Sequence, residues 1–294
     1  GVCGPGRRHT VCPVAGELTP LQERRSVLET YRLKNIAILI LLLLNAFLLM
    51  LLGYQYLQSR QTASDTVEQL HTLFADSQLT LSDSVDPLEP VLSPMILSRN
   101  TSSEASIASA LLGGNPVSTS QGGGIYSYTS SAGTIQFRSG GSFDGSQLSL
   151  PVDDISDFAL SFCDDFGYGD VHMRITGNSG TVTGTQYVAD VPIRDCSVTL
   201  TFQNGCLTAV SGLHISLENA ALSSDEQLTC ATALVRFLDY RSTAGIICSK
   251  VTSVQCLYSL RSTSSTLRLI PVWQVETDTY TYLVDASSGE ISRL

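Results

Sequence analysis

The chain has 294 residues and a net charge of −10 at pH 7, from 27 acidic and 17 basic side chains. The charge is divided unevenly, because residues 1–60 carry +4 and residues 61–294 carry −14. The acidic main part argues against nucleic acid and anionic lipid as its partners, and its length suffices for one or two domains with hydrophobic cores.

The first 30 residues are rich in Gly, Pro and Arg and have no hydrophobic periodicity. We expect either a disordered cytoplasmic tail or mis-translated upstream sequence, in which case the protein would start near Val27 or Leu28. Recovery of a native peptide covering Cys3 or Cys12 would contradict the second alternative.

An uncharged apolar run, IAILILLLLNAFLLMLL, occupies residues 36–52. About 20 apolar helical residues cross a hydrocarbon core of about 30 Å, and residues 53–57 complete that length. We therefore predict a single N-terminal transmembrane helix, an anchor over residues 31–57. No small-residue cleavage site follows the run, so we prefer an uncleaved anchor to a signal peptide.

The flanks of this run predict its orientation. Four basic side chains lie shortly before it, Arg24, Arg25, Arg32 and Lys34. Only Arg60 follows closely. Because Lys and Arg accumulate on the cytoplasmic side, we expect a single-pass protein of the cell membrane with a cytoplasmic N-terminus and an extracytoplasmic C-terminal domain.

Asn45 is the one polar residue of the run. An Asn in a membrane helix can hydrogen-bond to a neighbouring helix, worth roughly 1 kcal/mol. We predict that Asn45 contacts a partner or a second copy of the chain, and passive tolerance in lipid is the alternative.

Residues 58–98 are predicted to form an extracytoplasmic stalk and linker. The stalk is predicted to continue the anchor as a helix, because its apolar residues fall on one helical stripe. The residues of this stripe are Leu57, Ala63, Val67, Leu70 and Phe74. Three prolines between residues 81 and 94 then predict extended chain.

Three amphipathic helices are predicted beyond the linker. The first has capping-box spacing at Thr101-x-x-Glu104 and ends at a Gly-Gly pair. The second starts near Ile155, with apolar residues on one face. The third follows Ser224-x-x-Gln227, which again has capping-box spacing.

Short strands follow each helix. Residues 196–202 alternate between apolar and polar side chains, as in a half-buried antiparallel strand, and Asn204-Gly205 predicts a tight turn. We therefore predict an α+β fold with repeated helix-plus-antiparallel-sheet units. The predicted subdomains are residues 99–221 and 222–294.

Little in the sequence predicts chemistry. It has no G-x-S-x-G or H-E-x-x-H motif, so we predict no enzyme, no catalytic, cofactor-binding or metal-ligating residue, and no cofactor. Asp164, Asp165 and Asp170 indicate a solvated loop or a weak cation site. The six cysteines beyond residue 60 indicate small buried thiols or disulfides. Trp273 indicates core packing or a partner contact, and we name it as the speculative ectodomain contact.

The C-terminal 73 residues resemble a PepSY-type module. Its pattern is Pro-Val-aromatic-x-Val, a turn, and then Val-Asp-Ala-x-x-Gly-Glu. The matching residues are Pro271, Val272, Trp273, Val275, Val284, Asp285, Ala286, Gly289 and Glu290. The resemblance implies a non-enzymatic extracytoplasmic module that binds or inhibits.

From residue 31 on, the anchor, stalk and repeated units together resemble the YycH/YycI family of Gram-positive bacteria. The resemblance implies an accessory regulator of the WalK sensor histidine kinase, a two-component system of cell-wall homeostasis. Its implied partners are that kinase or a paralogous accessory protein, in a homo- or hetero-oligomer. A membrane-tethered PepSY-type inhibitor of a protease or cell-wall component is the alternative.

Overall fold

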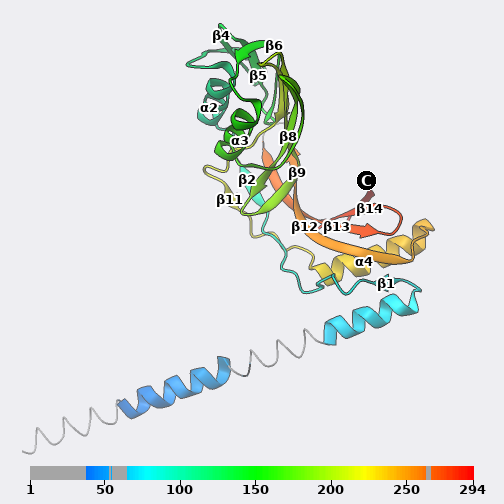
Figure 1. Cartoon of the computed structure of the whole chain (residues 1–294). Helices are drawn as coiled ribbons and strands as arrows, with labels where there is room; N and C mark the ends of the chain where they lie inside the picture. The colour runs from blue at the N-terminus through cyan, green and yellow to red at the C-terminus, as the bar shows by residue number, and fades with distance from the viewer. Residues whose placement is uncertain (1–37, 53, 55–64, 263–265) are drawn as a thin grey trace, which may run out of the picture. The chain divides into compact units, whose positions relative to one another are not determined.

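The computed structural model describes residues 38–52, 54, 65–262 and 266–294 (Figure 1). The chain divides into two compact units, residues 1–64 and 65–294. In the first unit, residues 38–52 and 54 are helical, and the Asn45 amide donates to the Leu41 carbonyl at 3.0 Å. The predicted tail, residues 1–30, lies outside the described residues, as do the two ends of the predicted anchor.

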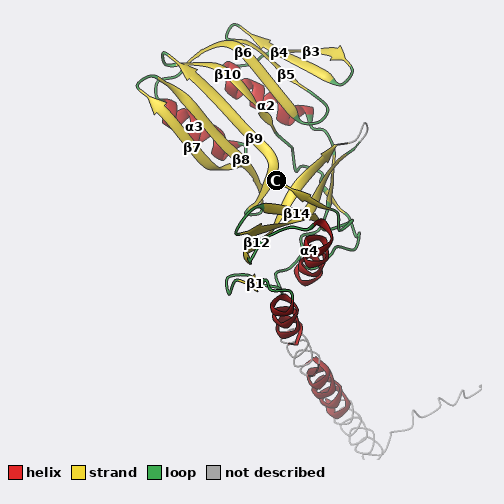
Figure 2. Cartoon of the chain, turned by 90° about the vertical axis from the view of Figure 1, so that its right-hand side faces the viewer, coloured by secondary structure: helices red, strands yellow, loops and turns green. Residues whose placement is uncertain are grey.

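The second unit is built on a sheet of eight antiparallel strands, which forms its larger part (Figure 2). Their order across the sheet is β7 (Tyr168–Thr176), β8 (Ser179–Val188), β9 (Val191–Gln203), β10 (Cys206–Leu213), β6 (Ser142–Pro151), β5 (Gly133–Phe137), β4 (Ile125–Ser130) and β3 (Val117–Gly122). The predicted alternation holds in β9, where Cys196, Val198, Leu200 and Phe202 are all buried.

The remaining described strands continue the same sheet through β12. They are β1 (Thr80–Leu81), β2 (Met95–Leu97), β11 (Ala221–Leu222), β12 (Lys250–Ser262), β13 (Leu267–Thr277), β14 (Thr281–Asp285) and β15 (Ile291–Arg293). Two pairings are parallel, β1 with β12 and β9 with β12. The sheet is therefore mixed.

This arrangement shows that the predicted fold class is wrong. The described strands form one large mixed sheet instead of separate repeated units. In the described part of the chain, no helix is both long and apolar enough to cross a membrane. The strands of the predicted units form one sheet because β9 is long. It pairs with β8 and β10, and it also meets β12, where Ile193 lies opposite Tyr258. Alternation indicates which face of a strand is buried, but not which strands lie beside it.

Helices α2 (Thr101–Leu112) and α3 (Ile155–Asp165) cover one face of the β3–β10 part of the sheet, as both views show (Figures 1 and 2). Each helix starts at a side-chain cap one residue before its first turn, Asn100 for α2 and Asp154 for α3. The cap of α2 is thus Asn100 instead of the predicted Thr101. Gly113 ends α2 in the left-handed conformation, as predicted.

Helix α4 (Cys230–Ala244) forms a second core with residues 65–76, which are helical. Its cap is Thr229, five residues after the predicted Ser224. Leu70 and Phe74 are 3% and 1% exposed in this core. The described part of the predicted stalk is therefore packed into the second unit, because its apolar stripe is buried against α4. Residues 58–64 lie outside the described residues.

Candidate functional site

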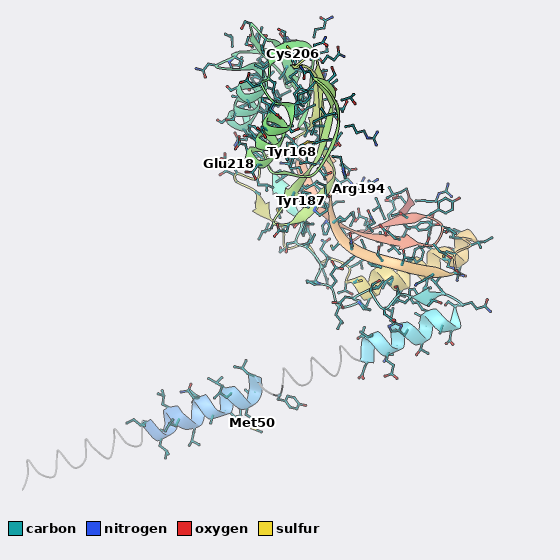
Figure 3. The ribbon with its side chains drawn as sticks, viewed as in Figure 1. Met50, Tyr168, Tyr187, Arg194, Cys206 and Glu218 are labelled. Carbon is teal, nitrogen blue, oxygen red and sulfur yellow. The ribbon has the colours of Figure 1, made fainter. Side chains whose placement is uncertain are left out.

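An open polar hollow of about 480 Å³ lies where three elements and one loop meet. It is lined by the first turns of α2, the end of α3, the end of β8 and the loop after β10. The lining residues are Ser102, Ser103, Ser106, Asp165, Phe166, Gly167, Gln186, Tyr187, His214, Ile215, Ser216, Leu217 and Glu218. Tyr187 and Glu218 lie toward the end of the sheet opposite Cys206 (Figure 3). Ser103, His214, Ile215 and Ser216 also line an adjoining cavity of about 20 Å³.

Gln186 braces the floor of the hollow. Its side chain is 3% exposed, and its amide pairs with both backbone groups of Ile215. The amide oxygen accepts from the Ile215 N–H at 3.0 Å, and the amide nitrogen donates to the Ile215 carbonyl at 2.8 Å. These two hydrogen bonds to the backbone determine which end of the side-chain amide is the oxygen and which is the nitrogen.

The orientation of Gln186 determines the tautomer of His214. The Gln186 amide nitrogen lies 3.3 Å from His214 Nδ1 and is a donor, so Nδ1 must accept. The single proton of the neutral ring is then on Nε2, which donates to Ser103 Oγ at 3.2 Å. A base that activates a serine needs the opposite arrangement, with Nε2 accepting the hydroxyl proton. His214 therefore does not activate Ser103 as a nucleophile in this geometry.

Burial keeps the His214 ring neutral. Loss of solvation lowers the pKa of the imidazole from 6.5 to about 4. The rings of Tyr168 and Phe166 lie 5.8 Å and 6.1 Å from it, centroid to centroid. At neutral pH the ring is thus an uncharged part of a hydrogen-bond chain from Gln186 to Ser103.

Asn100 holds the two sides of the hollow together. Its side-chain oxygen accepts from the backbone N–H groups of Ser102 and Ser103, at 2.9 Å and 3.2 Å. Its amide nitrogen donates to Ser216 Oγ and to the Glu218 carboxylate. The same residue therefore caps α2 and anchors the loop after β10.

The charge around the hollow is negative. Asp165 and Glu218 line it, and among its described lining residues there is no Lys or Arg. Tyr187 donates to the carboxylate of Asp170, and this hydrogen bond raises the pKa of the phenol to about 12. Arg99 lines only the adjoining cavity, where it is bound bidentately by Glu104 at 2.6 Å and 2.9 Å.

The sequence-predicted residues lie elsewhere. Trp273 is fully buried in the core beside α4, and its indole N–H donates to the Leu228 carbonyl at 2.8 Å. This burial is what the core-packing interpretation of Trp273 expects, and its speculative partner contact stays a prediction. The Asn45 side chain bonds within its own helix, and its predicted partner contact stays a prediction.

Asp164 and Asp165 end α3, whereas Asp170 lies in β7, and of the three only Asp165 lines the hollow. The described residues contain no group of three potential metal ligands. The six described cysteines are free thiols, five of them buried. His214 and Gln186 were missed. The sequence carries no signal for them, since their partners are tens of residues away along the chain.

The comparisons with known proteins give little. No protein-family model and no curated protein matches the chain. Among solved structures, the chain is similar to the Bacillus megaterium YpeB C-terminal domain, with 13% identity and a TM-score of 0.34. The likeness covers 67% of this chain and 99% of that domain. So low a TM-score gives no basis for carrying over a fold or a function, and the comparisons do not support membership of the YycH/YycI family.

Proposed function

We propose that this chain is a non-enzymatic binding protein, which regulates a membrane partner by holding a segment of it in the hollow around His214. The observation that carries the proposal is the Gln186–His214–Ser103 chain. It presents Ser103 as a hydrogen-bond group and does not activate it. Polar groups that converge on an open hollow from four segments are typical of a ligand site.

The proposed location is the outer face of a cell membrane. Its support is the composition of residues 36–52, together with the excess of Lys and Arg before them. The finer proposal is that the partner is a sensor histidine kinase of a cell-wall two-component system. Its support is the resemblance of the sequence to accessory regulators of that kind. Regulation then requires that the chain bind two states of the kinase with different affinity.

A second candidate is a PepSY-type module that inhibits a protease or binds a cell-wall component. It is favoured by the sequence pattern of residues 271–290, which falls on β13, β14 and the turn that precedes β15. In these strands Val272 pairs with Asp285 and Trp273 pairs with Val284. Residues 272–275 are mostly buried, so the pattern there contributes packing rather than an exposed contact.

Crosslinking of the full-length chain in its membrane tests the proposal. We expect the double variant Ser103→Ala/Ser216→Ala to lose the crosslinked partner. The matched control is Ser146→Ala, on an exposed serine of β6 outside both cavities. Equal crosslinking by the two variants would contradict a role for the hollow. Asn45→Leu separately tests a contact through the apolar segment, which predicts weaker association.

A further inference from the structure

The hollow presents two hydroxyl groups whose oxygens are already occupied by protein donors. Ser103 Oγ accepts from His214 Nε2. Ser216 Oγ accepts from the Asn100 amide at 3.2 Å and from the Glu218 N–H at 3.3 Å. A hydroxyl that accepts in this way keeps its own O–H to donate. Because such chains polarise their members, the last O–H is a better donor than an isolated serine.

An anion does not fit these donors. Asp165 and Glu218 line the same hollow, and no basic side chain is among its described lining residues. The charge of Arg99 is taken by Glu104. The N-terminus of α2 offers no substitute, because Asn100 already accepts from the N–H groups of Ser102 and Ser103.

A simple cation does not fit either, because it would meet the donor hydrogens of Ser103 and Ser216. What matches the hollow is an uncharged ligand that carries acceptor oxygens and N–H donors side by side. A peptide backbone has both on every residue. The volume of about 480 Å³ is in the range of ligand pockets, roughly 300–1,000 Å³.

We propose that the hollow binds an extended, uncharged peptide segment through its backbone, with carbonyl oxygens accepting from Ser103 and Ser216 and N–H groups donating to Asp165 and Glu218. This inference rests on the proposed function and names the chemistry of what the hollow holds. The side chains of Phe166 and Tyr187 supply the apolar part of the wall.

The test uses the full chain in detergent and three pools of dye-labelled, end-blocked hexapeptides, composed of neutral, acidic or basic residues. Fluorescence polarisation measures binding. We expect the neutral pool to bind most tightly. Ser103→Ala and Ser216→Ala should each weaken its binding about three- to tenfold, as expected for one hydrogen bond. Ser103→Thr, which keeps the hydroxyl, should restore binding, and Ser146→Ala should leave it unchanged.

Three results would overturn the inference: no binding by any pool, tightest binding by a charged pool, or equal binding by wild type and both alanine variants. Thermal unfolding of each variant shows whether the hollow remains folded.

The two proposals fail separately. Suppose that the neutral pool binds in the hollow while membrane crosslinking is unchanged in the Ser103 and Ser216 variants. The proposed ligand class is then supported and the proposed partner function is contradicted. If crosslinking depends on these serines while no pool binds, the ligand class fails alone. If the neutral pool binds and crosslinking also depends on these serines, competition by the pool against the crosslinked partner shows whether a segment of the partner occupies the hollow.

Discussion

The protonation of His214 should make the stability of the fold depend on pH in a defined window. The neutral ring is held by the Gln186 donor on one nitrogen and by the Ser103 hydroxyl on the other. Protonation would place an Nδ1–H against the Gln186 amide hydrogens in a buried site. The acidic groups that line the same hollow, Asp165 and Glu218, favour the charged ring but do not offset its loss of solvation.

The size of the effect follows from the fall of the pKa from 6.5 to about 4. A tenfold change in proton affinity is worth about 1.4 kcal/mol, so His214 accounts for on the order of 3 kcal/mol. Between these two pKa values the unfolded chain binds more protons than the folded chain. The contribution is therefore fully present above pH 6.5 and is lost as the pH falls toward 4.

The assay is urea unfolding at several pH values, for wild type and for His214→Gln, which cannot be protonated. Carboxylates titrate in both proteins and cancel in the difference. We expect the free energy of unfolding of wild type to fall relative to the variant by about 2–3 kcal/mol between pH 7 and pH 4. Parallel curves for the two proteins would refute the reasoning.

Three further predictions concern the packing. Trp273→Ala should cost about 3–5 kcal/mol and Trp273→Phe less, measured by urea unfolding with circular dichroism; equal small losses would contradict full burial. Iodoacetamide should label Cys206 of the native protein before Cys230, because burial raises the pKa of the Cys230 thiol to about 12; mass spectrometry reads the order, and equal labelling would contradict it. Gly212→Ala should cost on the order of 1–3 kcal/mol, because its Cβ would lie 2.6 Å from the Ser197 carbonyl oxygen. Gly140→Ala, with an ordinary contact at 3.5 Å, should be nearly neutral, and urea unfolding of both variants measures the difference.

Local patterns in the sequence predicted the elements that depend on nearby residues. The alternation in residues 196–202 and the tight turn at Asn204-Gly205 both rest on neighbours, and both are found, with positive φ at the two turn residues. The caps were predicted less well. Asn100 and Thr229 each lie before the first turn, as a cap must, whereas capping-box spacing also occurs at Ser224 without a helix start.

The sheet and the hollow could not be predicted in the same way. Nothing local distinguishes β9 as the strand that meets β12, because that contact is a single pair between residues 193 and 258. The hollow depends on long-range contacts of its own, because its lining comes from α2, the end of α3, β8 and the loop after β10. His214 is an isolated histidine in the sequence, and it gains its tautomer only when β8 brings Gln186 beside it.

The central claim is that the hollow around His214 holds a segment of a partner, and one measurement tests it most directly. A photo-crosslinking residue is placed at Leu217, which lines the hollow and is 37% exposed, and separately at Gln203, an exposed position paired with Cys206 at the far end of the sheet, in the full-length chain in its membrane. We predict a discrete crosslinked partner from position 217, none from position 203, and loss of the product when Ser103→Ala is added. Equal products from both positions, or a product whose yield is unchanged by Ser103→Ala, would contradict the account.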